Sequence, residues 1–182
     1  MTSRVASIAF VAVVVCLLPR SASAHRVDEY LQATRISVER GRVVLDMTLT
    51  PGIEVAPLVF SWIDANHDGR ISSKEGAAYA GHVLHSLELS VDGHPVALAA
   101  AAHEFPAFRE MSLGVGAIRL RAAAKLPWMS AGDHRVVYRN THRPEWSVYL
   151  ANALVPDDNR VQIVEQQRDR AQRELTIHYR LL

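Results

Sequence analysis

The chain is short of three features that often reveal what a protein does: cysteine, long apolar runs and an excess of one charge. It has one cysteine in 182 residues, and its 20 Lys and Arg are balanced by 19 Asp and Glu. The longest apolar run, residues 8–18, is shorter than the roughly 20 residues that a membrane-spanning helix needs. These absences argue against a disulfide-stabilised scaffold, a membrane-embedded protein and a nucleic-acid-binding protein.

The first 24 residues have the pattern of a secretory signal peptide. Arg4 supplies a positive charge, residues 8–18 are apolar, and residues 22–24 (Ala-Ser-Ala) form a small-x-small cleavage site. We therefore expect cleavage near Ala24 and a mature chain that is periplasmic or secreted and has no membrane span. Because Cys16 leaves with the leader, the mature chain has no disulfide and depends on its core and on any bound metal for stability.

Most of the mature chain has the two-residue periodicity of β-strands. Apolar and polar residues alternate over residues 30–49 around Gly41 and over residues 87–98 around Asp92-Gly93, which predicts two hairpins. Six further strands are predicted in short segments between turn residues: 104–108, 116–124, 134–140, 146–153, 160–166 and 174–182. This pattern predicts a single mainly β domain over residues 25–182, an antiparallel β-sandwich of the immunoglobulin-like kind.

Helical spacing interrupts the strands at about residues 53–85. Apolar residues three or four apart predict a short helix over residues 53–63. Ser72 and Glu75 have the spacing of a capping box, which predicts a second helix that ends near His85. We therefore expect a helix-loop-helix unit inserted after the first two strands.

Between these helices, residues 64–75 have the spacing of a twelve-residue EF-hand calcium loop. Calcium takes roughly six to eight oxygen ligands, and a glycine at the sixth loop position allows a sharp turn. Gly69 occupies that position, and Ser72 offers a hydroxyl at position 9. The predicted ligands are oxygen atoms at positions 1, 3, 5, 7 and 12, which belong to Asp64, Asn66, Asp68, the carbonyl of Arg70, and Glu75. The alternative is an Asp/Asn/Gly-rich turn that binds nothing.

A lone loop of this kind is more typical of a structural ion than of a calcium sensor. Sensors open a methionine-rich groove, and neither predicted helix contains methionine. Outside the cytoplasm, an affinity of about 10⁻⁴ to 10⁻³ M is enough to keep the site filled. We therefore predict that Ca²⁺ stabilises the fold and that the protein is a binding or interaction module.

The histidines suggest a second kind of metal site. Cleavage after Ala24 leaves His25 as the first residue, so that its imidazole lies beside a free amine. These two nitrogens can chelate nickel, cobalt or copper. The alternative function is therefore a periplasmic nickel-, cobalt- or copper-binding accessory protein that uses His25. His82 and His85, three residues apart on the second predicted helix, could also share a cation, although a solvated pair explains them as well.

No catalytic motif accompanies these sites. The chain has no nucleophile elbow, no glycine-rich phosphate loop and no zinc-protease helix motif. Residues 142–146 combine acidic, basic and aromatic groups, but a loop that enters a strand accounts for them. We therefore predict that the protein is not an enzyme.

Three segments together carry a resemblance to a known family: the mature start at residues 24–30, the loop at residues 64–75 and the Val91-Asp92-Gly93 turn. With these segments the chain resembles the extracytoplasmic N-terminal domain of nickel/cobalt permeases of the hydrogenase- and urease-accessory kind. The resemblance implies a calcium-dependent periplasmic module whose partner is a membrane metal transporter or another extracytoplasmic protein. The polytopic membrane domain of those permeases is absent from this sequence, so transport itself is not implied.

Overall fold

The computed structural model describes residues 28–182, and the predicted signal peptide and His25 lie outside this range. Strands make up 47% of the described residues and helices 17%, so the prediction of a mainly β protein is confirmed. The elements of residues 28–182 follow in this order: β1 (Tyr30–Glu39), β2 (Arg42–Pro51), α1 (Ala56–Ile63), α2 (Ser73–His85), β3 (Leu87–Val91), β4 (His94–Pro95), β5 (Ala99–Glu104), α3 (Phe108–Ser112), β6 (Ile118–Lys125), β7 (Gly132–Asn140), β8 (Ser147–Ala153), β9 (Val161–Arg168) and β10 (Glu174–Leu181).

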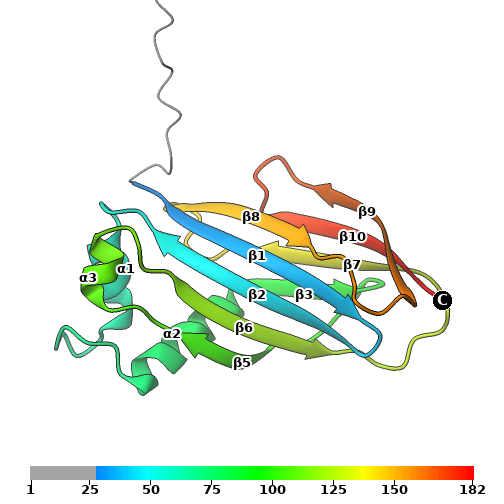
Figure 1. The fold of residues 1–182 in the computed structure, drawn as a ribbon, viewed down its shortest axis with the longest axis horizontal. Coiled ribbons are helices and arrows are strands. Elements are labelled where there is room, and N and C mark those ends of the chain that lie inside the picture. The colour runs from blue at the N-terminus through cyan, green and yellow to red at the C-terminus, as the bar shows by residue number, and fades with distance from the viewer. Residues whose placement is uncertain (1–27) are drawn as a thin grey trace, which may run out of the picture.

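The first sheet has the strand order β5-β6-β2-β1-β8 (Figure 1). Its centre is the predicted hairpin of β1 and β2, in which Val38 pairs with Val43 and Ile36 pairs with Leu45. This hairpin is confirmed. β8 pairs with β1 in parallel, so the expectation of a purely antiparallel arrangement is wrong at this pair. The reason is the connection before β8, because residues 141–146 carry the chain from β7 in the other sheet to the end of the first sheet at which β1 begins.

The second sheet has the strand order β4-β3-β7-β10-β9, and all of its pairs are antiparallel. The predicted turn between β3 and β4 is confirmed, although β4 has only two residues. Asp92 and Gly93 have φ of 50° and 83° in this turn. Two residues with positive φ match the right-handed twist of a hairpin, which explains why Asp-Gly is found there.

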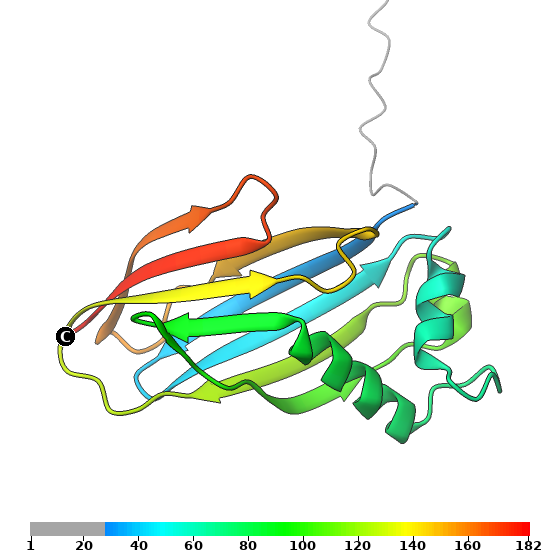
Figure 2. The ribbon, with the colours of Figure 1, turned by 180° about the vertical axis from the view of Figure 1, so that it is seen from behind.

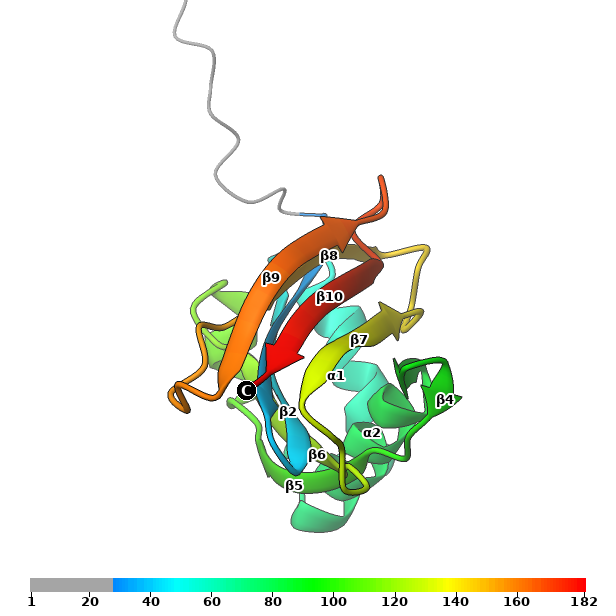
Figure 3. The ribbon, with the colours of Figure 1, turned by 90° about the vertical axis from the view of Figure 1, so that its right-hand side faces the viewer.

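One hydrophobic cluster joins both sheets and the three helices of residues 28–182. Figure 3 shows the sheets as two layers, with β1 and β2 in one and β7 and β10 in the other. Ile36 and Leu45 from the first layer and Val136 and Ile177 from the second have no exposed surface. The cluster also contains Val59 of α1 and Val83 of α2 among its buried members. The helices are therefore anchored to the core of the sheets.

The three helices lie at one end of the sheets, and α2 lies beside β5 and ends where β3 begins (Figures 1 and 2). α1 and α3 pack together, with the rings of Phe60 and Phe108 4.7 Å apart. Among residues 28–182, none of the helices has both the length and the apolar character that crossing a membrane requires.

The strand predicted over residues 104–108 is wrong. β5 ends at Glu104, and α3 begins at Phe108. Pro106 lacks the N–H that a strand pair needs, and Glu110 accepts the Ala107 N–H at 2.9 Å, which starts the helix. The Phe105 ring packs against α2 where Gly76 leaves room, since a Cβ there would lie 2.9 Å from that ring.

Candidate functional site

The predicted calcium loop lies between α1 and α2. The Asp64 N–H donates to the Phe60 carbonyl at 2.9 Å, so the loop begins where α1 ends. At its other end, the Ser72 N–H donates to Glu75 Oε2 at 2.9 Å and the Ser72 hydroxyl accepts the Glu75 N–H at 3.3 Å. These two bonds form the predicted capping box, which is confirmed. Ile71 is half-buried and packs against the core, so the loop is attached to the sheets as well as to the helices.

Asp64 is the centre of the loop, because its side chain is buried and the backbone curls around it. The residue is 4% exposed. Its Oδ1 accepts the Asp68 N–H at 3.1 Å, and its Oδ2 accepts the Gly69 N–H at 2.9 Å. His67 and Gly69 have positive φ, 59° and 78°, which turns these N–H groups toward Asp64. One carboxylate therefore fixes the first half of the loop.

The oxygens of Asn66 and Asp68 also face the loop backbone. Asn66 Oδ1 accepts the Asp68 N–H at 3.0 Å, and Asp68 Oδ1 accepts the Arg70 N–H at 2.8 Å. The Asn66 amide donates to Asp68 Oδ2 at 3.1 Å. The side chains of Asn66, Asp68 and Arg70 are exposed, so these bonds are made at the surface.

Glu75 closes the loop from the first turn of α2. Its Oε2 accepts the Ser72 hydroxyl at 2.7 Å, and its Oε1 accepts the Asn66 N–H at 3.2 Å. The hydrogen bonds from the Ser72 side chain and backbone lower the pKa of the Glu75 carboxyl, with a smaller contribution from the Asn66 N–H. The carboxylate is thus ionised at neutral pH, as a calcium ligand must be.

The chemistry of these groups fits a hard cation, because the five predicted ligands are all oxygen atoms. In residues 28–182, however, no three His, Cys, Asp or Glu side chains lie close enough together to hold a metal ion. The carboxylates of Asp64, Asp68 and Glu75 accept loop N–H groups instead. The calcium site therefore stays a prediction.

The other histidines of the sequence analysis are placed differently. His25 lies outside the described residues. His82 and His85 are exposed in the last turn of α2 and line a pocket of about 520 Å³. The pocket is also lined by Trp62 of α1 and by residues 142–145 of the β7–β8 loop. Two segments that were considered separately in the sequence thus meet at one pocket.

His142 connects this pocket to a buried chain of hydroxyl groups. Its Nε2 lies 3.2 Å from the Tyr79 hydroxyl, which lies 2.9 Å from the Tyr30 hydroxyl. Burial raises the pKa of Tyr79 to about 12, so it remains a neutral donor. Burial, with the charge of Arg143, lowers the pKa of His142 to about 4. A neutral His142 accepts from Tyr79 at Nε2 and carries its proton on Nδ1.

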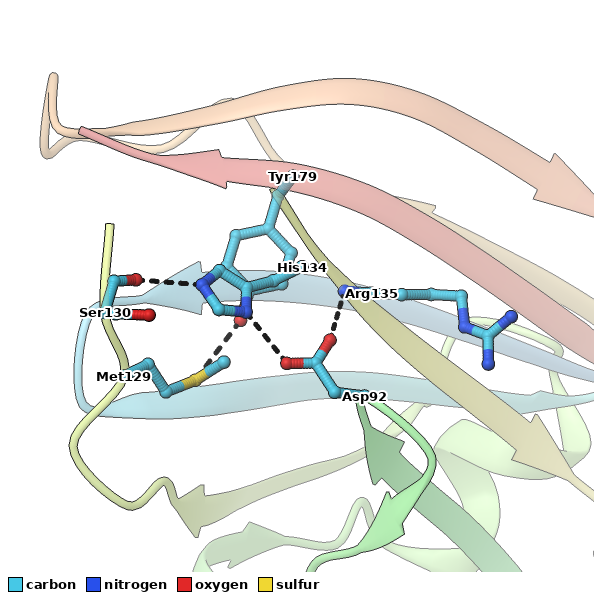
Figure 4. Close-up of polar contacts among 6 residues, drawn as sticks. All are labelled: Asp92, Met129, Ser130, His134, Arg135 and Tyr179. Carbon is cyan, nitrogen blue, oxygen red and sulfur yellow. Dashed lines mark hydrogen bonds and ion pairs between the residues drawn. The ribbon is translucent and has the colours of Figure 1, made fainter. Parts of the chain in front are cut away.

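A second polar cluster, shown in Figure 4, was missed by sequence reasoning. His134 Nδ1 lies 2.8 Å from Asp92 Oδ2, and its Nε2 lies 2.9 Å from the Ser130 carbonyl. Asp92 Oδ1 accepts the Arg135 N–H at 2.8 Å, and the ring of Tyr179 lies over His134. Because both ring nitrogens face acceptors, the imidazolium form satisfies both bonds. The third partner is a backbone carbonyl, so the pair is a structural clamp and not a nucleophile-activating dyad.

The clamp predicts a pH dependence that can be measured. Burial lowers the pKa of His134, but the bonds to Asp92 and Ser130 outweigh it and raise the pKa above 6.5. The protonated His134 therefore contributes about 1 kcal/mol to the free energy of unfolding. This contribution is fully present below pH 6.5 and is lost as the pH rises through the raised pKa of His134. An NMR titration should show His134 titrating above 6.5 in the wild type and lower in Asp92→Asn. Titration below 6.5 in the wild type contradicts this assignment.

Comparison of the chain with family models, with curated proteins and with solved structures found no match.

Proposed function

We propose that residues 64–75 bind one calcium ion in the manner of an EF-hand loop. The ligands are Asp64, Asn66, Asp68, the Arg70 carbonyl and Glu75, with Glu75 contributing both of its oxygens. The observation that carries the proposal is the buried Asp64 carboxylate, which the backbone of its own loop encloses between two helices. Calcium is the cation that such a set of oxygen ligands in a flexible loop favours.

The ion acts as a structural element and not as a switch. A sensor separates its two helices when calcium binds, and the freed faces become a groove. Here Ile63 of α1 and Val83 of α2 are already part of the core of the sheets. Residues 142 and 143 further hold both helices, since His142 contacts Tyr79 of α2 and the Arg143 guanidinium lies 4.2 Å from the centre of the Trp62 ring of α1. Separating the helices would break these contacts.

The loop belongs, in this proposal, to an extracytoplasmic module. The module is an immunoglobulin-like sandwich with an EF-hand insertion at about residues 53–85, exported by the signal peptide of residues 1–24. Two sheets around a common cluster support the sandwich, and the leader pattern supports export. The module binds an extracytoplasmic partner, a membrane metal transporter in the resemblance described above, and performs no catalysis.

The test compares thermal unfolding in calcium and in chelator. With a Kd between about 10⁻⁴ and 10⁻³ M, 10 mM Ca²⁺ stabilises the fold by about 1.4 to 2.7 kcal/mol. For a chain of this size, that is a rise in Tm of about 4 to 8 °C. Differential scanning calorimetry of the chain from His25 onward measures this difference directly.

The variant Glu75→Gln tests whether the effect of calcium arises from this loop. It keeps an oxygen that can accept the Ser72 N–H, so the cap of α2 survives while the charged ligand is lost. The matched control is Glu110→Gln, because Glu110 caps α3 in the same way outside the loop. The calcium-dependent rise should vanish in Glu75→Gln and persist in Glu110→Gln. A rise that survives in Glu75→Gln excludes this loop as the site.

A further inference from the structure

The pocket lined by Trp62, the last turn of α2 and residues 142–145 contains an arginine that forms no ion pair within the described residues. Arg143 lies on the β7–β8 loop, and its guanidinium carbon is 4.2 Å from the centre of the Trp62 ring. Stacking on an aromatic face leaves the N–H groups at the edge of the guanidinium free. Within residues 28–182, no carboxylate forms an ion pair with Arg143 and no acceptor takes its N–H groups. The guanidinium is therefore positioned but unpaired.

The backbone holds Arg143 in this position at a cost. Its φ is 51°, in the left-handed region that residues with a side chain seldom adopt. The preceding residue is fixed, because the His142 N–H donates to Asn140 Oδ1 at 2.9 Å and its carbonyl accepts the Tyr149 hydroxyl at 2.9 Å. Strain that is maintained by surrounding bonds is frequent at ligand-binding positions. The fixed backbone at His142 thus precedes an exposed arginine whose side chain lines the pocket.

The last turn of α2 supplies two further hydrogen-bond donors to the pocket. His82 and His85 are exposed there and line the same pocket as Arg143. Both imidazoles can donate a hydrogen bond to an anion. Trp62 and Pro144 add apolar surface to the lining of the pocket. The pocket volume of about 520 Å³ is within the range of small-molecule sites.

We propose that this pocket binds a small dicarboxylate, with one carboxylate paired to Arg143 and the other hydrogen-bonded to His82 and His85. Arginine binds a carboxylate through two parallel N–H bonds, and the apolar surface of Trp62 and Pro144 suits a short carbon chain. Glu145 lines the same pocket and opposes an anion. Its charge disfavours inorganic phosphate more than a dicarboxylate, because phosphate concentrates a similar charge on fewer atoms. This site is independent of the calcium loop.

Succinate is the probe, and titration calorimetry on the chain from His25 onward is the measurement. A ligand of this size should bind with a Kd of about 1 mM. Arg143→Gln should weaken binding at least about tenfold, whereas Glu145→Gln should strengthen it about threefold. The control is Arg170→Gln, which removes one exposed arginine far along the chain, between β9 and β10, and should leave the Kd unchanged.

A second variant and three other ligands test the proposal even if Arg143→Gln does not fold. The double variant His82→Gln/His85→Gln alters only exposed helix positions and should also weaken succinate binding. Neutral succinamide, inorganic phosphate and cationic putrescine should all bind more weakly than succinate. The proposal is overturned if succinate does not saturate the wild type at concentrations about tenfold above the expected Kd. It is also overturned if phosphate or putrescine binds more tightly, or if the arginine and histidine variants leave binding unchanged.

Discussion

The Asp64→Asn variant is expected to lose calcium affinity by about 100-fold or more, because it removes the one ligand charge that is buried inside the loop. It should also be less stable without calcium, by about 2 kcal/mol. The Asp64 carboxylate accepts two backbone N–H groups, and an amide offers one oxygen and one NH₂ in its place. The NH₂ group would face an N–H donor in a site that is 4% exposed.

Calcium titration and urea unfolding in chelator measure the two effects separately. Asp157→Asn is the matched control, since Asp157 is an exposed carboxylate outside the loop. It should change neither the affinity nor the free energy of unfolding appreciably. If Asp64→Asn binds calcium as tightly as the wild type, Asp64 is not a ligand. If the affinity falls but the stability in chelator does not, the two hydrogen bonds contribute less than the geometry implies.

Acidification is expected to destabilise the fold through His142. Burial and the neighbouring Arg143 hold the pKa of His142 at about 4, whereas an unfolded histidine titrates near 6.5. Between these two values the unfolded chain binds more protons, so stability is present above pH 6.5 and falls as the pH drops toward 4. The loss attributable to His142 over this interval is about 3 kcal/mol. When the ring is protonated at Nε2, Tyr79 of α2 loses the acceptor for its hydroxyl proton.

Urea unfolding at several pH values between 7 and about 4.5 tests this account. The variant His142→Gln cannot titrate, so its stability should depend less steeply on pH, although it is lower at pH 7. The control His94→Gln removes an exposed histidine on β4 and should retain the wild-type dependence. NMR titration of His142 gives a second readout, and a ring that titrates near 6.5 contradicts the account.

Much of the strand pattern was predictable because burial in this chain follows local alternation. β1 alternates between buried and accessible residues along its length, and β2 does so from Leu45 onward. Asp92-Gly93 provides the positive φ that the turn between β3 and β4 requires. The capping box of Ser72 and Glu75 was equally local. Such features are determined by residues a few positions apart, so the sequence alone reveals them.

The errors arose where partners far apart in the chain decide the structure. Residues 104–108 alternate like a strand, but the packing of Phe105 on α2 and of Phe108 on Phe60 gives a loop and a helix. The direction of β8 depends on its pairing with β1, more than a hundred residues earlier. The bonds of His134 to Asp92 and of His142 to Tyr79 span 42 and 63 positions. No periodicity of the sequence indicates such pairs.

The calcium loop depends both on residues that are close in the sequence and on residues that are far apart. The spacing of its oxygen residues is local and was predicted, whereas the burial of Asp64 and the attachment of both helices to the core depend on the whole fold. Tyr79 lies one turn after Glu75 on α2 and contacts both Tyr30 and His142. The loop is therefore supported at both ends by elements that the sequence alone did not connect to it.

The most direct test of the central claim is a calorimetric titration of the chain from His25 onward with Ca²⁺ after treatment with chelator. The account predicts one ion bound per chain with a Kd between about 10⁻⁴ and 10⁻³ M, and a Kd at least about 100-fold weaker in Asp64→Asn and Glu75→Gln. Absence of saturable heat in the wild type at about 10 mM Ca²⁺, or binding that survives in both variants, would contradict it.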